Sequence, residues 1–266
     1  SLSKEYISGE APDKWIPLHS PDFYDNWDIE LLTEHRATEL DTENQTVTFE
    51  NGKNLEFDKL LCATGGVPKE LDIPGNNLQG YSLLRSYEDA RRILDNVENA
   101  ESVAIIGAGF IGMEAAAALK EKELETHVIA PESVPMASTF GEDIGNWLRT
   151  VHENHGVQFH LGNTVDEING DSKVESLNLS NGTKINADAV IMGVGITPAT
   201  RWLEGSGILQ NGVVSVNTYL QSRVSNIYAA GDIALVPAPQ TGDKYRVEHW
   251  TVAERQGQNA ALNMLG

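Results

Sequence analysis

The chain has 266 residues, of which 40% are hydrophobic and 22% charged, an ordinary composition for a globular protein of one or two domains. Its formal net charge of −20 argues against nucleic acid or an anionic membrane as a partner. No apolar run is long enough to cross a membrane and no secretory signal opens the sequence, so we expect a cytoplasmic protein without a membrane anchor.

The single cysteine, Cys62, excludes an internal disulfide and therefore a redox-active cysteine pair within this chain. It lies in an apolar run and is expected to be a small core residue. The seven histidines lack the spacing of metal ligands, so no metal site is predicted. His152 and His155 are expected on the surface of a helix.

The first third of the chain predicts loops followed by a small β-sheet. Prolines interrupt residues 1–30, which are expected to form loops and short helices, and residues 29–32 have the composition of a short strand. Residues 38–59 predict a β-meander with its turn at Asn51-Gly52. Residues 58–63 predict a further apolar strand that ends at Thr64-Gly65-Gly66.

A strand, a glycine-rich turn and a helix are expected in the middle of the chain. A helix over residues 86–94, with Ser86 as N-cap, leads into a β-branched run at 102–106, which predicts a buried parallel strand. Gly107, Gly109 and Gly112 then form G-x-G-x-x-G, and the alanine-rich residues 115–119 favour a helix.

The three glycines suit a dinucleotide. Gly107 permits a tight turn, Gly109 lets the backbone approach a pyrophosphate, and Gly112 allows close packing of helix and strand. The pyrophosphate would lie at the positive end of the helix. Glu132 comes 20 positions after Gly112, near the spacing of a ribose hydroxyl acceptor. A plain tight turn between strand and helix is the alternative.

The remainder of the chain repeats the early pattern. A helix is expected over 142–155, with Ile144, Leu148 and Val151 on one face. Further strands are expected at 126–130, 157–161, 164–168, 174–179, 183–185, 188–192, 213–216 and 226–230, and a final amphipathic helix at 248–265. A meander followed by a buried strand thus occurs twice, which suggests two related nucleotide-binding units. Only the second carries a glycine fingerprint.

Five segments together resemble the FAD-dependent pyridine nucleotide-disulfide oxidoreductases, most of all the apoptosis-inducing factor and ferredoxin (rubredoxin) reductase group. They are Leu2-Ser-Lys4, Ala63-Thr-Gly-Gly66, Gly107-Ala-Gly-Phe-Ile-Gly-Met-Glu114, Ala230-Gly-Asp232 and Val247-Glu-His-Trp250. The resemblance implies an α/β fold of two Rossmann-like, three-layer β/β/α domains, the NAD domain being inserted in the FAD domain.

The implied domains are a first part of the FAD domain at 1–84, an NAD domain at 85–206 and a second part of the FAD domain at 207–266. Family members also carry a G-x-G-x-x-G segment before the position of Leu2 and a further α/β domain after that of Gly266. The sequence is therefore expected to be a piece of a longer flavoprotein.

The resemblance also assigns site residues. Lys4 and Glu114 match a catalytic pair beside the flavin, and the FAD-binding positions are Lys4, Ala37, Thr64, Gly65, Arg85, Asp232, His249 and Trp250. From the residues alone, ordinary alternatives remain for six of them. These are a solvated Lys4, a Glu114 that complements the helix dipole, an N-cap Asp232, an ion-paired surface Arg85, a cap or surface His249 and a core Trp250.

The implied NAD-binding positions are Gly107, Gly109, Phe110, Ile111, Gly112, Glu132, Gly195 and Glu248. Residues 131–140 contain no lysine or arginine to neutralise a 2′-phosphate, and a carboxylate at Glu132 would repel one. The sequence therefore favours NAD over NADP.

Three functions remain open at this stage. The first is an NADH-dependent FAD oxidoreductase that passes electrons to a ferredoxin, rubredoxin or Rieske-type acceptor. The second is a slow-turnover, NADH-sensing flavoprotein with a binding or conformational role. The third is a nucleotide-binding module kept for structure.

Overall fold

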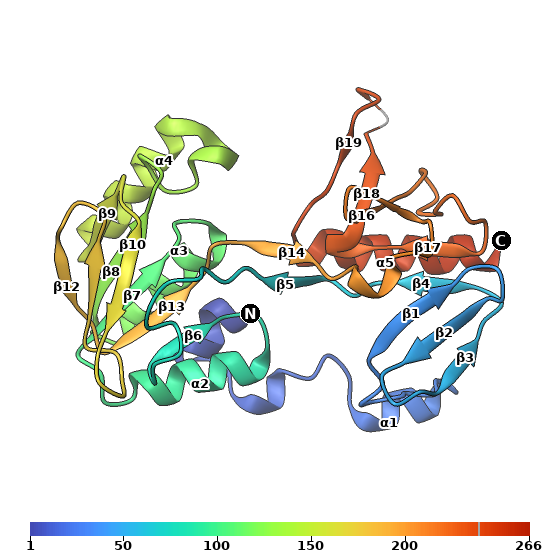
Figure 1. Ribbon diagram of the computed structural model, residues 1–266, viewed down its shortest axis with the longest axis horizontal. Coiled ribbons are helices and arrows are strands. Elements are labelled where there is room, and N and C mark those ends of the chain that lie inside the picture. Colours follow the sequence, from blue (N-terminus) through green and yellow to red (C-terminus); the bar gives the residue numbers. More distant parts are fainter. Residues whose placement is uncertain (239) are drawn as a thin grey trace. The chain divides into compact units, whose positions relative to one another are not determined.

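The computed structural model describes residues 1–238 and 240–266, without the side chain of Pro21. The chain divides into two compact units (Figure 1), one of residues 1–20 and 68–196 and the other of residues 21–67 and 197–266. The two units alternate along the chain, because residues 21–67 separate the two segments of the first unit and residues 68–196 separate those of the second. The boundaries differ from the ranges expected from the sequence, because residues 1–20 and 68–84 pack with the first unit. The functional names of the units stay predictions.

The centre of the first unit is a five-stranded parallel sheet in the order β6-β13-β7-β8-β9. Its strands are β6 (Tyr81–Leu83), β13 (Ala189–Met192), β7 (Ser102–Ile106), β8 (Glu125–Ala130) and β9 (Val157–Leu161). Every residue of β7 and β13 is buried. Their continuous apolar runs suit a parallel sheet that is covered on both faces, and the four strands predicted for this region are confirmed.

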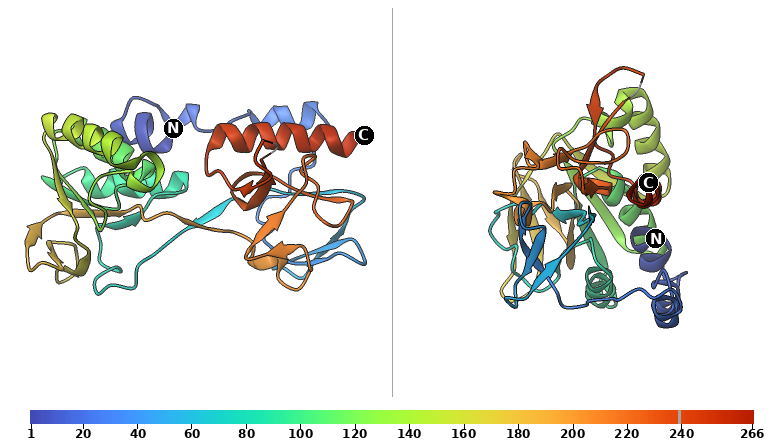
Figure 2. Two further views of the ribbon diagram at one scale, coloured as in Figure 1. Left: turned by 90° about the horizontal axis from the view of Figure 1, so that it is seen from above. Right: turned by 90° about the vertical axis from the view of Figure 1, so that its right-hand side faces the viewer.

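Helices cover one face of this sheet and a meander covers the other (Figure 2). The helices are α2 (Tyr87–Val97), α3 (Phe110–Glu121) and α4 (Ala137–Asn154), and the meander is β10 (Val165–Asn169), β11 (Ser176–Leu179) and β12 (Lys184–Asn186). Because side chains alternate along a strand, Val103 and Ile105 pack among the helices while Ala104 and Ile106 pack under the meander. This is the three-layer β/β/α arrangement predicted from the sequence.

Two helices show how local sequence sets their ends and faces. The Ser86 side chain accepts from the Asp89 amide in a capping box, which confirms the predicted start of α2. In α4, however, the predicted apolar face is wrong at Ile144, which is 47% exposed. The packed face instead runs through Gly145, because a side chain there would collide with Val134 and Pro135.

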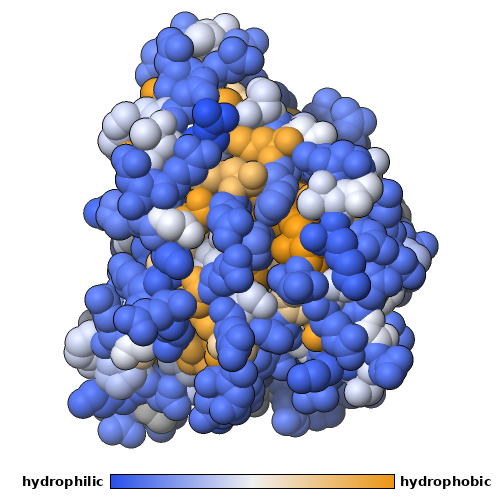
Figure 3. Space-filling model, turned by 90° about the vertical axis from the view of Figure 1, so that its left-hand side faces the viewer, coloured by the Kyte–Doolittle hydropathy of each residue, from blue (hydrophilic) through white to orange (hydrophobic). Residues whose placement is uncertain are grey.

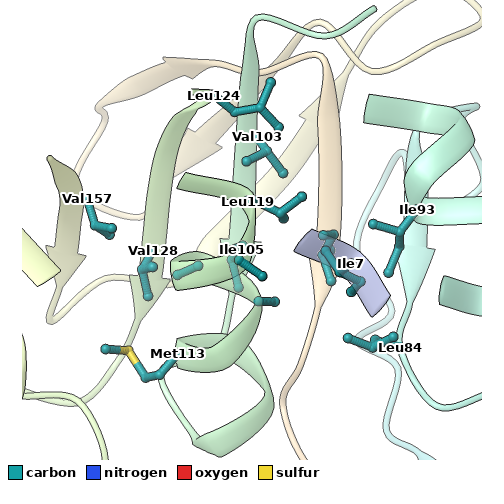
Figure 4. Close-up of a cluster of buried hydrophobic side chains, with 14 of the residues drawn as sticks. Ile7, Leu84, Ile93, Val103, Ile105, Met113, Leu119, Leu124, Val128 and Val157 are labelled. Atoms are coloured by element: carbon teal, nitrogen blue, oxygen red, sulfur yellow. The ribbon is translucent and has the colours of Figure 1, made fainter. Parts of the chain in front are cut away.

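The first residues of the chain are built into the first unit. They form a π-helical turn, η1 (Leu2–Tyr6), and a short 3-10 helix, η2 (Asp13–Trp15). Ile7 is fully buried in the helix-side core, where Figure 4 shows it near Ile93 and Leu119. The Tyr6 hydroxyl donates to Asp13 at 2.8 Å. These contacts fix the position of Lys4 relative to α3.

The second unit is built from small sheets around one core. An antiparallel meander consists of β1 (Ala37–Asp41), β2 (Thr46–Phe49) and β3 (Asn54–Glu56), and β4 (Leu60–Cys62) pairs in parallel with β17 (Ile227–Ala229). The other elements are α1 (Pro21–Asn26), η3 (Arg201–Leu203), β15 (Leu209–Gln210), β16 (Val213–Ser215), η4 (Gly231–Ile233), β18 (Ala234–Pro237), β19 (Lys244–Tyr245) and α5 (Trp250–Leu265). Two short strands, β5 (Gly66–Pro68) and β14 (Ile196–Pro198), pair with each other. The predicted meander, strands and final helix are confirmed.

The strand expected at residues 29–32 is wrong. These residues form no strand, and Ile29, Leu31 and Leu32 are exposed. A short apolar run becomes a strand only where a neighbouring strand pairs with it, and the meander beside this segment begins at Ala37.

The first unit carries a histidine pair that the sequence did not reveal. His127 on β8 is buried, and its Nδ1 lies 3.1 Å from Nε2 of His160 on β9. Glu125 lies 3.6 Å from Nε2 of His127. Burial lowers the pKa of both imidazoles, and His160 lowers the pKa of His127 further.

We expect this pair to make stability depend on pH. Because the pKa values are depressed in the folded chain, the pair's contribution is fully present above about pH 6.5, the unfolded value, and is lost as the pH falls through the folded values. Urea unfolding at pH 7.5 and pH 5.5 measures this loss in the wild type. His160→Gln, which removes one imidazole, is expected to reduce the difference. An equal pH difference in the two proteins would contradict the assignment.

Candidate nucleotide-binding site

The glycine turn after β7 is shaped by two glycines that nothing larger could replace. Gly107 has a φ of +110°, and an added Cβ would lie 2.4 Å from the carbonyl oxygen of Gly193. At Gly112 an added Cβ would lie 2.0 Å from the carbonyl oxygen of Gly107. Both roles predicted for these residues, the tight turn and the close packing of helix and strand, are therefore visible in the structure.

Gly109 differs from its two neighbours in the motif. Its φ of −84° suits any residue, and an added Cβ would meet nothing within 4 Å. The fold therefore does not require glycine at this position. A ligand that approaches the backbone would explain why the residue is glycine. The open space lies at the start of α3, where the N-cap makes no side-chain hydrogen bond and backbone N–H groups favour an anion. These residues fit a dinucleotide pyrophosphate.

The surroundings of the turn are apolar and accessible. Phe110 and Ile111 in the first turn of α3 are exposed, and the Phe110 ring packs edge-on against Phe140 of α4 with 5.7 Å between centroids. Gly195, at the end of the segment that follows β13, has a φ of +97° and open space where a side chain would stand. Because β7 and β13 are parallel neighbours, both segments lie at the carboxyl edge of the sheet, where such folds bind ligands.

Glu132 lies just beyond the carboxyl end of β8, the next strand of the same sheet. It is exposed, and its backbone carbonyl accepts from the Gly162 amide at 3.1 Å. The side chain is thus held on an anchored turn at the same sheet edge as the glycine motif. This placement suits the predicted contact with ribose hydroxyls.

Lys4 and Glu114 meet although 110 positions separate them in the sequence. Lys4 Nζ lies 2.9 Å from Glu114 Oε1, and this bond raises the pKa of Lys4 above its ordinary value. Glu114 itself lies beyond the first turn of α3, which contains no acidic residue. The prediction that the helix dipole stabilises the Glu114 carboxylate is therefore wrong, because the dipole effect fades past the first turn.

A second partner of Glu114 was not foreseen. Ser3 is buried, and its hydroxyl donates to Glu114 Oε2 at 2.5 Å. The adjacent residues Ser3 and Lys4 thus hold the two oxygens of one carboxylate. The sequence showed only a lysine and a glutamate, and no spacing rule places two successive residues of one turn on the same group.

The pair borders a pocket of about 490 Å³ between η1, α3 and α4. Its lining includes Lys4, Glu114, Phe110, Met113, Met136 and Phe140. Most of the pocket surface is apolar, and its charged lining residues are Lys4 and the carboxylates of Glu5, Glu10, Glu114 and Glu121.

In the second unit, several predicted residues lie at the carboxyl ends of β4 and β17. Thr64 donates to the Ala199 carbonyl at 2.8 Å, and Gly65 has a φ of +66°. Asp232 is buried within η4 and is not the N-cap of that short helix, which is Ala230. Of the remaining predicted positions, Ala37 begins β1 and Arg85 precedes the cap of α2 in the first unit.

The start of α5 gathers three further predicted residues. His249 is its N-cap and accepts from the Thr251 amide, so the capping role is real. Trp250 is 72% exposed, which rules out a place in the core. Glu248 lies 2.6 Å from Arg246, whose other nitrogen donates to the Asp232 carbonyl. Arg246 was missed in the sequence, where a lone arginine before Glu248 carries no signal.

Cys62 is buried, which is the position expected of a small core residue, and burial raises the pKa of its thiol to about 12. Residues 1–238 and 240–266 hold no group of three or more potential metal ligands. His152 is only partly exposed, whereas His155 lies on the helix surface as expected.

The face of the molecule drawn in Figure 3 is predominantly polar, with apolar side chains exposed between polar ones. None of the described helices combines the length and the apolar character that a membrane span needs.

The fold and the glycine turn are those of α/β proteins that bind dinucleotides at the carboxyl edge of a parallel sheet. A family model described as pyridine nucleotide-disulphide oxidoreductase matches residues 3–257. The chain belongs to this family of oxidoreductases.

Comparisons with individual proteins place the chain near ferredoxin reductases. It is 35% identical to apoptosis-inducing factor 3 of Mus musculus over 96% of this chain and 43% of that protein. It is 32% identical to rhodocoxin reductase of Rhodococcus erythropolis over 100% of this chain and 62% of that protein. The crystal structure of a ferredoxin reductase from Rhodopseudomonas palustris matches with a TM-score of 0.94 at 28% identity, covering 100% of this chain and 66% of that one. The chain thus spans about half the length of its curated relatives.

The family implies binding of FAD and of a pyridine nucleotide. Solved structures of this fold include a water-forming oxidase from Lactobacillus brevis bound to NADH and its engineered form bound to NADPH. The fold alone therefore does not choose between the two nucleotides.

Proposed function

We propose that this chain is the nucleotide-binding part of an NADH-dependent FAD flavoprotein that passes electrons to a ferredoxin, rubredoxin or Rieske-type acceptor. The observation that carries this proposal is the glycine turn with open space at Gly109, together with the Lys4–Glu114 pair at the edge of the adjoining pocket. The ferredoxin reductases among its relatives support the choice of acceptor.

The first unit would bind NADH. Backbone N–H groups at Phe110 and Ile111 would hold the pyrophosphate, Glu132 would accept from the ribose hydroxyls, and Gly195 would let the nicotinamide approach. Phe110 offers an exposed ring against which a nicotinamide can stack. The family resemblance also assigns Glu248, in the second unit, to NAD.

The residues that would hold FAD include hydrogen-bonding groups at the carboxyl ends of β4 and β17. Asp232 offers a nearly buried carboxylate that can accept from ribityl hydroxyls, and Thr64 and Gly65 leave the backbone accessible. Ala37, Arg85, His249 and Trp250 would complete the site. Bound FAD would supply the redox chemistry, taking two electrons and a proton from NADH as hydride and releasing electrons singly to the acceptor.

Lys4 would act as a fixed positive charge beside the flavin. Glu114 raises the pKa of Lys4 above its ordinary value, and the amine is protonated at neutral pH. Glu114 supplies the opposite charge, which lets the lysine remain partly buried when a cofactor covers it. The pair would thus favour the negative charge that a flavin gains on reduction.

The nucleotide preference is tested at Glu132. In Glu132→Lys we expect the affinity for NADH to fall by about tenfold or more, because a charged hydrogen bond to the ribose contributes about 1.5–3 kcal/mol. The affinity for NADPH should rise. Isothermal titration with both nucleotides measures this, and Glu142→Lys, an exposed residue of α4 with the same change of charge, is the matched control. Unchanged NADH affinity in Glu132→Lys would contradict the assigned ribose contact.

The redox proposal is tested in the protein that carries this chain, loaded with FAD under anaerobic conditions. NADH should bleach the flavin absorbance, and an added ferredoxin should restore it within the catalytic cycle. A flavin that NADH does not reduce would overturn the proposal. A long-lived reduced complex that no acceptor reoxidises would favour the NADH-sensing function instead, consistent with the similarity to apoptosis-inducing factor 3.

A further inference from the structure

Ser3 has no part in the function proposed above, yet it makes one of the shortest polar contacts in the first unit. Its hydroxyl donates to Glu114 Oε2 at 2.5 Å, and its side chain is buried. Lys4 Nζ lies 2.9 Å from the other oxygen, Oε1. A carboxylate bonded at both oxygens by groups on one turn cannot rotate freely about its terminal torsion.

The backbone around Ser3 explains how two successive residues reach the same carboxylate. Leu2–Tyr6 is a π-helical turn, in which the Tyr6 amide donates to the Ser1 carbonyl at 3.1 Å. Short π-helical turns are frequent at functional sites because they redirect side chains from the usual helical spacing. Tyr6 and Ile7 are buried in the helix-side core and hold the turn in place.

The two partners of Glu114 differ in exposure. The Lys4 side chain is 54% exposed and flexible, so on its own it would hold the carboxylate weakly. Ser3 is buried and short, and it loses little rotamer freedom when it binds. The serine is therefore the partner able to fix the carboxylate, and the lysine then finds Oε1 already oriented.

We propose that Ser3 is a positioning residue, which orients the Glu114 carboxylate so that the Lys4 ammonium stays bonded at the edge of the pocket. The importance of this for hydride transfer rests on the proposed function. The orientation itself is a property of the chain without any cofactor and can be measured as such.

The test measures how strongly Lys4 is held, through the rate at which its amine is reductively methylated at pH 8. Mass spectrometry gives the rate, with Lys14 in the same digest as internal reference. Loss of an exposed ion pair shifts an equilibrium by a few-fold at most, so Ser3→Ala should make Lys4 react about twofold faster and Glu114→Gln faster still. Ser3→Thr, which keeps the hydroxyl, should react like the wild type.

Ser8→Ala is the matched control, because this serine lies on the next turn and donates to the Glu5 carbonyl without touching Glu114. Its Lys4 reactivity should equal that of the wild type. A Ser3→Ala chain whose Lys4 reacts at the wild-type rate, or more slowly because the hydroxyl merely competes for the carboxylate, would overturn the inference. Thermal unfolding of each variant separates this readout from loss of fold. Failure of the redox proposal would leave these rates unchanged, so the two can be told apart.

Discussion

Replacing Gly112 by alanine should destabilise the first unit by about 3 kcal/mol, near the upper range for overpacking a rigid site. The added methyl would lie 2.0 Å from the carbonyl oxygen of Gly107 and 3.1 Å from the carbonyl carbon of the same residue. Both atoms belong to the backbone of the turn, so α3 and β7 would have to separate. Thermal unfolding followed by circular dichroism measures the effect, and a fall in Tm of several degrees is expected at this chain length.

Gly257 provides the control for that experiment. It lies inside α5, its φ is not positive, and an added Cβ would meet nothing within 4 Å. Gly257→Ala should leave the stability unchanged or raise it by about 0.5–1 kcal/mol through helix propensity. Equal stability of the Gly112→Ala protein and the wild type would show that α3 and β7 are not in the close contact described.

Replacing Gly109 by alanine should have the opposite signature, with the fold kept and the nucleotide lost. The added methyl enters open space, so the stability should change by less than about 1 kcal/mol, the cost of a poorer N-cap. The same methyl would occupy the place from which a pyrophosphate contacts the turn. We expect the affinity for NADH to fall at least about tenfold, which corresponds to about 1.4 kcal/mol of steric conflict.

Isothermal titration and thermal unfolding on one preparation of Gly109→Ala separate the two effects. A stable variant that binds NADH like the wild type would mean that the open space at Gly109 is not where the pyrophosphate binds. A variant that unfolds would mean that Gly109 is needed by the fold. The contrast with Gly112→Ala therefore distinguishes a glycine kept for a ligand from one kept for packing.

Much of the fold was accessible from the sequence because local and tertiary preferences agree. The β-branched run at Ser102–Ile106 predicts a strand buried on both faces, and the sheet buries it so. Asn51-Gly52 predicts a turn, and Gly52 has a positive φ. The repetition of meander and buried strand suggested two related units, and the family resemblance implied the three-layer arrangement that the first unit has.

The failures are those that only tertiary packing decides. Residues 29–32 have the composition of a strand but find no strand to pair with. Ile144 fits an apolar face by periodicity, yet the close approach of α4 at Gly145 turns that side chain outward. Periodicity locates the apolar face of a helix only approximately. The exact residues that face the core are decided by how the helix packs on its neighbours.

In the candidate site, too, some contacts could be predicted from the sequence and others depend on tertiary packing. The family resemblance predicted that Lys4 and Glu114 form a pair although 110 positions separate them, and the contact is confirmed. Ser3 could not be foreseen, because its contact depends on a π-helical turn that no residue pattern in Leu2–Tyr6 announces. The role of Arg246 likewise follows only from its contacts with Glu248 and the Asp232 carbonyl, which the structure shows.

In the proposed function, the glycine turn at the start of α3 binds the pyrophosphate of NADH. Backbone amide shifts in a ¹H–¹⁵N NMR titration of the ¹⁵N-labelled chain with NADH test it most directly. We expect the largest shifts at the amides of Gly109, Phe110 and Ile111, with smaller ones at Gly195 and Glu132. Shifts confined to other parts of the chain, or none at saturating NADH, would contradict it.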